Sequence, residues 1–205
     1  MKHHEQWLEW AVELQSLAQT GLYYGKDKFD RERYTRIREI AAEMMARQAD
    51  LPLEQVEKWF CCETGYQTPK LATRAAVFQE ERILLVKEPK GWALPGGWVD
   101  VDVSVRENVV KEVREEAGLE VRPDRVIALQ DGENHHETVY PWKVCIVFVL
   151  CTPLGGKFQK NLETSASGYF GLDELPELDL EKTTPEQLRM CFEARRTDSW
   201  KTILE

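Results

Sequence analysis

The sequence predicts an α/β fold, in which an α/β/α sandwich with a mixed sheet follows a small all-α N-terminal domain. Two observations lead to this fold class. Residues 1–67 carry apolar side chains at three- and four-residue steps, which is typical of amphipathic helices. Residues 68–205 hold short β-prone runs bounded by turn residues, with helical segments at 104–117 and after Thr184. Helices between strands predict a sheet covered on both faces, so we expect two domains with these bounds.

Three helices are expected in the N-terminal domain. Apolar side chains at helical spacing define the first two, namely Trp7, Trp10, Leu14 and Leu17, and then Ile37, Ile40, Ala41 and Met44. Asp30 is the expected N-cap of the second helix, and Asp50 and Pro52 are expected at the start of the third. Two tryptophans on the first helix indicate a face that is buried against the rest of the chain or against a second copy.

Five strands and two helices are expected in the second domain. The strands are predicted at 71–78, 83–88, 121–130, 140–150 and 166–172. The helix at 104–117 is expected to end at Gly118. A C-terminal helix is expected to begin at Thr184 or Pro185. Its inward side chains should be Leu188, Cys191 and Phe192.

The charge of the chain argues against tight binding to polyanions. It has 27 Lys and Arg against 36 Asp and Glu, a formal net charge of -9. Residues 1–67 are themselves acidic, with 9 Lys and Arg against 12 Asp and Glu, whereas a DNA-reading module needs a basic face. Apolar runs such as 144–150 are too short to span a bilayer, and the N-terminus lacks an apolar signal-peptide core. We therefore expect a cytoplasmic protein that binds neither membranes nor DNA.

The cysteines and histidines indicate neither a disulfide framework nor a zinc site. The five cysteines form an odd set without a CxxC pair: Cys61, Cys62, Cys145, Cys151 and Cys191. Two of them, at 145 and 151, are expected to be buried apolar filler on one strand face. His135 and His136 lie in a polar loop without a third ligand at metal-binding spacing. We expect both histidines to be exposed to solvent.

Three glutamates crowd one turn of the helix at 104–117. Glu112, Glu115 and Glu116 stand at i, i+3 and i+4, so a helix places them on one face within about 6 Å of each other. Because like charges repel, this placement needs a reason. Such a cluster offers oxygen ligands to a hard cation, and Mg²⁺ is held by few carboxylates together with substrate phosphates. The alternative is a solvated acidic helix face, which is common.

The residues around this cluster resemble the signature of the Nudix hydrolases, GX5EX7REUXEEXGU, in which U is aliphatic. The match aligns Gly97 with the first glycine and residues 111–119 with the second half of the signature. The preceding stretch WALPGG, residues 92–97, is similar to the loop that such proteins carry just ahead of the signature. The resemblance implies the Nudix sandwich and metal-dependent cleavage of a diphosphate.

Two positions depart from the signature. Val103 replaces its first glutamate, and Lys111 replaces its arginine. In the family the first glutamate mainly forms an ion pair in the loop, so its loss is expected to weaken the scaffold more than the chemistry. Lysine can still anchor a carboxylate as a point charge, and Asp100 or Asp102 could supply the missing negative charge. The alternative is a protein that binds its ligand without cleaving it.

The resemblance also implies roles for the site residues. Glu112 and Glu116 are the expected direct ligands of Mg²⁺ or Mn²⁺, and Glu115 is expected to share a metal or to position water. The carbonyl of Gly96 or Gly97 would add a further oxygen ligand. Bound metal would neutralise the diphosphate and lower the pKa of a water molecule.

Further candidates lie outside the signature. Family members often take a general base or an extra metal ligand from a glutamate in the loop before the last strand, and Glu163 occupies that loop. An exposed loop acid is the alternative. Arg74 and Lys87 are candidates for phosphate contacts, with solvated strand positions as the alternative. The candidates for stacking on a base, with core packing as the alternative, are Trp92, Tyr140 and Trp142.

The resemblance extends to the N-terminal region. A helical domain of about 60 residues, followed by residues 65–78 and 167–178, is similar to a bacterial Nudix subgroup that includes the CDP-choline pyrophosphatases of bacilli. Members of this subgroup share the lysine and lack the first glutamate. The resemblance implies hydrolysis of CDP-choline to CMP and phosphocholine by a homodimer. The alternatives are an ADP-ribose pyrophosphatase, an enzyme that processes RNA ends, which the acidic charge does not favour, and a ligand-sensing regulator without catalytic activity.

Overall fold

The computed structural model describes residues 3–136 and 142–205. The chain divides into two compact units. The first contains the described residues up to Pro69 together with 142–143, and the second contains the remainder. No helix among the described residues is long and apolar enough to cross a membrane.

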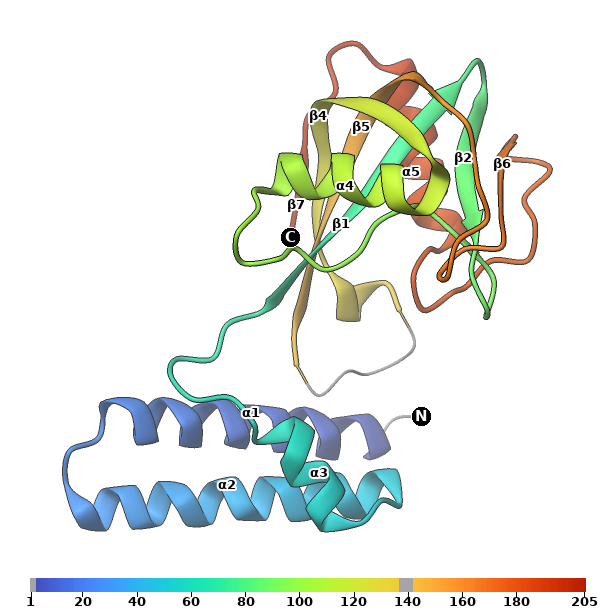
Figure 1. Ribbon diagram of the computed structural model, residues 1–205. Coiled ribbons are helices and arrows are strands. Elements are labelled where there is room, and N and C mark those ends of the chain that lie inside the picture. The colour runs from blue at the N-terminus through green and yellow to red at the C-terminus, as the bar shows by residue number, and fades with distance from the viewer. Residues whose placement is uncertain (1–2, 137–141) are drawn as a thin grey trace. The chain divides into compact units, whose positions relative to one another are not determined.

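The first unit is helical (Figure 1). Its helices are α1, His3–Tyr24; α2, Lys28–Ala49; and α3, Leu53–Phe60. The prediction that Asp30 is the N-cap of α2 is wrong, because Oδ1 of Asp27 accepts hydrogen bonds from the N–H groups of Phe29 and Asp30. Asp50 does not begin α3 but ends α2 as its C-cap in the left-handed conformation, at φ 51°. Pro52 is the residue immediately before α3, as expected.

Small side chains form much of the core of the helical unit. Ala11 of α1 and Ala41 and Ala42 of α2 are completely buried, and small side chains let helices approach closely. The two tryptophans of α1 lie outside this core, since Trp7 and Trp10 are 54% and 42% exposed. The exposed aromatic face of α1 is therefore not covered by the described part of this chain.

The second unit is built on a mixed sheet (Figure 1). Its strands are β1, Lys70–Gln79; β2, Arg82–Lys87; β3, Trp92–Ala93; β4, Leu119–Asp131; β5, Val144–Gly156; β6, Ala166–Phe170; and β7, Ile203–Leu204. The strand order is β3-β2-β1-β5-β4-β7, and β6 pairs with β2. β1–β5 and β4–β7 are parallel pairs, and the other pairs are antiparallel. β3 and β7 were not expected from the sequence, because two residues are too few to show an alternating pattern.

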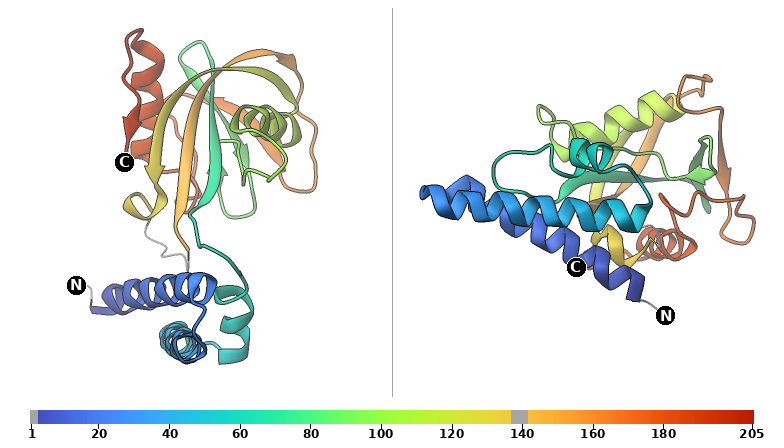
Figure 2. Two further views of the ribbon diagram at one scale, coloured as in Figure 1. Left: turned by 90° about the vertical axis from the view of Figure 1, so that its left-hand side faces the viewer. Right: turned by 90° about the horizontal axis from the view of Figure 1, so that it is seen from below.

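Two helices, α4 (Val105–Ala117) and α5 (Pro185–Arg196), cover opposite faces of this sheet (Figure 2). Ala75 of β1 is buried together with Val109 of α4. Phe78 of the same strand instead packs edge to face on Phe192 of α5, with ring centroids 5.1 Å apart. This alternation confirms the predicted fold class, a mixed sheet with helices on both faces after an N-terminal helical region.

The helix ends of the second unit follow the local sequence. Ser104 caps α4 in a capping box with Glu107, and Gly118 ends the helix at φ 68°. Thr184 is the N-cap of α5 and Pro185 its first residue. The side chains expected to face inward from α5 are buried, as predicted: Leu188, Cys191 and Phe192.

Candidate active site

The glutamates of α4 do not share one environment. The helix buries Val109 and its neighbours against the sheet, and Glu112 and Glu116 lie at the border of that buried face, 8% and 5% exposed. Glu115 points away from it, and its side chain is 52% exposed. The start of α4 is fixed by Asn108, a buried amide that donates a hydrogen bond to the hydroxyl of a β1 threonine at 2.9 Å. The structure therefore pairs Glu112 and Glu116 and leaves Glu115 near solvent.

Two glycines let the preceding loop approach both β1 and α4. Gly96 has a φ of 148°, and a Cβ there would lie 2.1 Å from the carbonyl oxygen of Thr73. A Cβ on Gly97 would lie 2.8 Å from Oε2 of Glu112. The N–H of Gly96 donates a hydrogen bond to Oε2 of Glu116 at 2.9 Å. The backbone of this loop is thus in direct contact with the carboxylate pair.

Burial changes the protonation of this pair. Burial is the largest influence on Glu116 and raises the pKa of its carboxyl group to about 7, although the Gly96 hydrogen bond and the Arg74 charge act in the opposite direction. Burial also raises the pKa of Glu112, and the charges of Glu115 and Glu163 add to that rise. The ionised form of each carboxyl group would therefore be stabilised by a nearby positive charge.

Arg74 lies beneath the loop as a buried cation. Its Nη1 donates a hydrogen bond to the carbonyl of Gly96, and its Nε donates to the carbonyl of Lys182 at 3.3 Å. Burial lowers the pKa of its guanidinium, while neighbouring carboxylates raise it, with Glu116 first and Glu88 second. The predicted contact between Arg74 and a phosphate stays a prediction. These contacts show the side chain supporting the loop that touches Glu116.

Lys111 has carboxylate partners on two sides. Its Nζ lies 2.8 Å from Oδ2 of Asp100, 3.5 Å from Oε1 of Glu112 and 3.9 Å from Oε2 of Glu115. The hydrogen bond to Asp100 is the main cause that raises the pKa of the lysine. Asp100 thus supplies Lys111 with the negative charge that is missing at Val103, where the signature has its first glutamate.

The Glu163 loop is attached to the C-terminal end of α4. Nδ2 of Asn161 donates to the carbonyl of Glu115 at 2.8 Å, and the hydroxyl of Thr164 donates to the carbonyl of Glu116 at 2.7 Å. The side chain of Glu163 is exposed, yet its charge contributes to the raised pKa of Glu112. The loop therefore brings Glu163 towards the carboxylate pair, as the sequence prediction of its role requires.

Comparison with known families identifies this arrangement. Residues 68–191 match the model of the NUDIX domain, which is more than half of the chain. The chain belongs to the Nudix family. Residues 5–60 of this Nudix protein match a second model, described as a UDP-X-like, N-terminal oligomerisation domain. The family predicted from the sequence signature is thereby confirmed.

Known relatives of this Nudix protein carry pyrophosphatase or diphosphatase names. A Bacillus subtilis protein, YjhB, provisionally named ADP-ribose pyrophosphatase, is 38% identical over the full length of both chains. A crystal structure of an ADP-ribose pyrophosphatase from Streptococcus suis is 56% identical over 67% of this chain and 100% of its own, with a TM-score of 0.63. A crystal structure of a UDP-X diphosphatase is 30% identical over 99% of this chain and 100% of its own, also with a TM-score of 0.63.

The donor set of the Nudix site fits a hard divalent cation, which Nudix hydrolases generally need. The buried Glu112 and Glu116 offer oxygen ligands, and their pKa values are raised chiefly because burial disfavours the ionised carboxylates, an effect that a bound cation would offset. Among the described residues, no group of three or more His, Cys, Asp or Glu side chains converges in metal-binding geometry. Two carboxylates are nevertheless enough for Mg²⁺, which also takes substrate phosphates and water. The parts of Glu115 and the Gly96 carbonyl as ligands stay predictions.

The remaining substrate candidates are less clearly placed. Lys87 is half-buried at the end of β2, opposite Trp92 of β3. The Trp92 ring packs edge to face on Phe170, with centroids 4.9 Å apart, as the core-packing alternative requires. Trp142 packs on a tryptophan of α3 in the helical unit, with centroids 6.3 Å apart. Tyr140 lies outside the described residues.

Sequence reasoning missed several polar groups beside the site. Glu88 pairs with Lys182, 94 residues away, and its charge acts on Glu116. The expectation that both histidines are exposed is wrong for His136, which is only 9% exposed and hydrogen-bonds the carbonyl of Leu180. His135 is half-buried, and its Nε2 lies 2.8 Å from Oε1 of Glu205. No local motif marks these residues, since each gains its partner from a distant segment.

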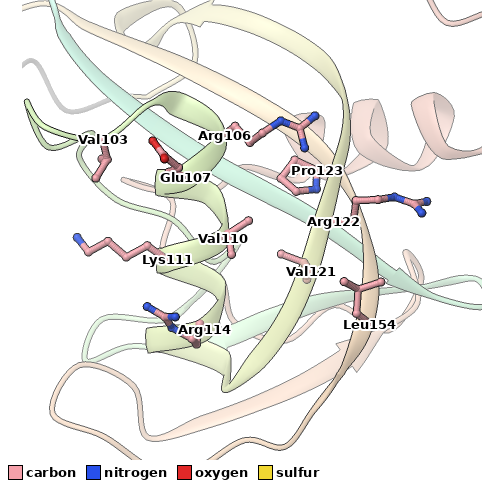
Figure 3. A pocket seen from close by; sticks show the side chains of 10 residues that line it. All are labelled: Val103, Arg106, Glu107, Val110, Lys111, Arg114, Val121, Arg122, Pro123 and Leu154. Atoms are coloured by element: carbon pink, nitrogen blue, oxygen red, sulfur yellow. The ribbon is translucent and has the colours of Figure 1, made fainter.

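A groove of about 610 Å³ lies on the other flank of α4 (Figure 3). Its basic side chains are Arg106, Lys111, Arg114 and Arg122, and the apolar ones between them include Val110, Val121 and Leu154. Neither carboxylate of the buried pair lines it. Two of its cations also have acidic partners, since Lys111 pairs with Asp100 and Arg122 with Asp124. The groove therefore does not include the carboxylate pair, although Lys111 lines it and also contacts Glu112.

Proposed function

We propose that this Nudix protein hydrolyses the diphosphate of a nucleoside diphosphate linked to a sugar, in a reaction that depends on Mg²⁺ or Mn²⁺. The observation that carries the proposal is the buried pair of Glu112 and Glu116 against the Gly96 loop. A buried pair of like charges is costly unless a cation joins it. A cation held there would be placed to receive the diphosphate of a substrate.

The residues of the site divide the chemistry among them. Glu112 and Glu116 would hold the metal, which when bound neutralises the diphosphate and lowers the pKa of attacking water. Arg74 and Lys111 fix the two carboxylates, the first through Gly96 and the second through its own ion pair. Glu163 is the candidate general base, because its loop is attached to the same helix. Water adds to one phosphorus, and the bridging P–O bond breaks.

ADP-ribose is the first candidate substrate, because the full-length Bacillus relative and the Streptococcus structure both carry that name. A UDP-linked compound is the second, since the N-terminal model and one full-length structural relative are described as UDP-X proteins. The sequence resemblance to CDP-choline pyrophosphatases is not matched by the names of these relatives, so CDP-choline is kept as a third arm of the test. A regulator without catalytic activity is the alternative from another class.

Product analysis by HPLC tests this proposal. We expect ADP-ribose to give AMP and ribose 5-phosphate in Mg²⁺ or Mn²⁺, and we expect EDTA to reduce the rate by roughly 10³-fold or more. UDP-glucose, CDP-choline and a 5′-triphosphate RNA are compared at equal concentration. If CMP and phosphocholine appear fastest, the substrate assignment from the relatives is wrong. If no diphosphate is cleaved with either metal, the protein is a ligand-binding regulator.

We further propose that the protein is a homodimer formed through the exposed face of α1. Trp7 and Trp10 contact each other there, with ring centroids 5.2 Å apart, and both are largely exposed in the single chain. Exposed apolar patches of this kind mark interaction sites.

Light scattering after size exclusion should give a dimer for the wild type and a monomer for the double variant Trp7→Glu, Trp10→Glu. Tyr66→Glu, at another exposed aromatic residue of the helical unit, should stay dimeric. A monomeric wild type would contradict the proposal.

A further inference from the structure

His136 is a buried imidazole with a defined tautomer. It follows the short 3-10 helix η1 (Gly132–Asn134) and is 9% exposed. Its Nδ1 lies 2.9 Å from the carbonyl oxygen of Leu180. Because a carbonyl oxygen can only accept, Nδ1 carries the hydrogen, and Nε2 of the neutral ring holds a lone pair. Burial, and then the positive charge of Arg74, lowers the pKa of the imidazole, in keeping with a neutral ring.

The Nε2 atom of this ring has no hydrogen-bond partner among the described residues, although it is buried. Buried side-chain acceptors in native proteins almost always have a donor, so an exception requires an explanation. The contact at Nδ1 fixes the ring, since rotating it would break the bond to Leu180. A fixed and unpaired acceptor is suited to receive a donor that arrives with a ligand.

The surroundings connect His136 to the Nudix site. Residues 179–183 form a turn with two carbonyl groups that accept hydrogen bonds. The carbonyl of Leu180 accepts from His136, and the carbonyl of Lys182 accepts from Arg74. Arg74 also donates to Gly96, whose N–H holds Glu116. The turn thus joins His136 to the loop that contacts the carboxylate pair.

Two further contacts secure the 179–183 turn. The N–H of Asp179 donates to the carbonyl of Trp92 at 2.9 Å, and the hydroxyl of Thr183 accepts from the N–H of Leu94 at 3.0 Å. Both partners belong to the stretch that leads into the glycine loop. The turn that holds His136 is therefore also attached to the chain that leads into the Gly96 loop.

We propose that Nε2 of His136 accepts a hydrogen bond from the substrate, from a sugar hydroxyl or a base N–H beside the diphosphate. His136 is then a substrate-binding residue that the family signature does not contain. The inference rests on the proposed diphosphate hydrolysis. It predicts an effect on binding with little effect on the chemical step, because the residue contacts a part of the substrate that does not react.

The test uses His136→Asn, whose Nδ2 can keep the bond to Leu180 while the acceptor at Nε2 is lost. We expect KM to rise about tenfold with kcat changed less than about twofold, the size of one lost hydrogen bond to a substrate. Tm should stay close to the wild-type value. An unchanged KM would overturn the inference. If Tm also fell strongly, the role of the histidine would be structural only.

Substrate analogues distinguish the two possible donors. If a ribose hydroxyl is the donor, a 2′-deoxy or 3′-deoxy substrate should already bind the wild type weakly, and His136→Asn should add nothing further. If a base N–H is the donor, the loss should instead depend on the base. Additive effects with every analogue would overturn the inference.

A measurement without turnover separates this inference from the proposed function. In wild-type protein labelled with ¹⁵N-histidine and kept free of metal, the Nε2 resonance should move when AMP, UMP or CMP is added. A protein that cleaves no diphosphate but shows this shift would refute the proposed function and support the role of His136. An active enzyme whose Nε2 resonance stays unchanged at saturating nucleotide would overturn the role of His136 alone.

Discussion

Replacing Glu116 by glutamine is expected to reduce kcat/KM by roughly 10³-fold, because it removes one of two buried carboxylates that would hold the metal. The amide keeps the size of the side chain, and its oxygen can still accept from the N–H of Gly96. Glu115→Gln is the matched control, since that side chain is exposed and belongs to the same helical turn. Its loss of activity should be far smaller. Equal losses in the two variants would contradict the assignment of Glu112 and Glu116 as the central pair.

The same substitution should stabilise the metal-free protein at high pH. The pKa of Glu116 is raised to about 7 from the ordinary value of 4.5. Between pH 4.5 and about 7, the folded state therefore keeps a proton on this carboxyl group that the unfolded state has released. Stability is then lost as pH rises through this window, by on the order of 3 kcal/mol at its upper end. In EDTA at about pH 8, Glu116→Gln should melt higher than the wild type, and the difference should disappear below about pH 4.5. A lower Tm for the variant at pH 8 would contradict this account.

Replacing Arg74 by leucine is expected to cost about 3–5 kcal/mol of folding free energy, because it leaves neighbouring carboxylates without their buried counter-charge. Tm should fall by roughly 10 °C. Arg82→Leu is the matched control, since Arg82 forms an exposed ion pair with Glu174 at 2.9 Å, and such pairs contribute little. The deficit of Arg74→Leu should shrink at acid pH, where the carboxylates are protonated. Thermal melts of both variants across pH check this, and equal falls in Tm would refute it.

Local signals predicted the elements that position the site. The expected helix at 104–117 agrees with α4, which ends at Gly118 as predicted. The cap of α2 was misplaced by one turn because Asp27 and Asp30 are both good cap residues, and their sequence neighbours do not decide between them. Spacing alone also treats the three glutamates alike. Only packing against the sheet separates the exposed Glu115 from the buried pair.

Long-range pairs account for what the sequence could not show. Glu88 and Lys182 meet across 94 residues, and His136 finds its acceptor 44 residues later. The polar loop around His136 has the composition of solvent-exposed chain, and nothing within it reveals that the ring is covered. Its hydrogen bond to Leu180 depends on where the fold places the 179–183 turn.

Glu112 and Glu116 stand in the last two turns of α4, where the aligned peptide dipoles of the helix give a partial negative charge. Cations are favourable in that position, and Arg114 is the basic residue in the last turn of α4. The dipole and the two carboxylates therefore add to one negative potential at a single point of the molecule. If the proposed metal site is correct, this negative potential would add to the attraction that the two carboxylates exert on a divalent cation.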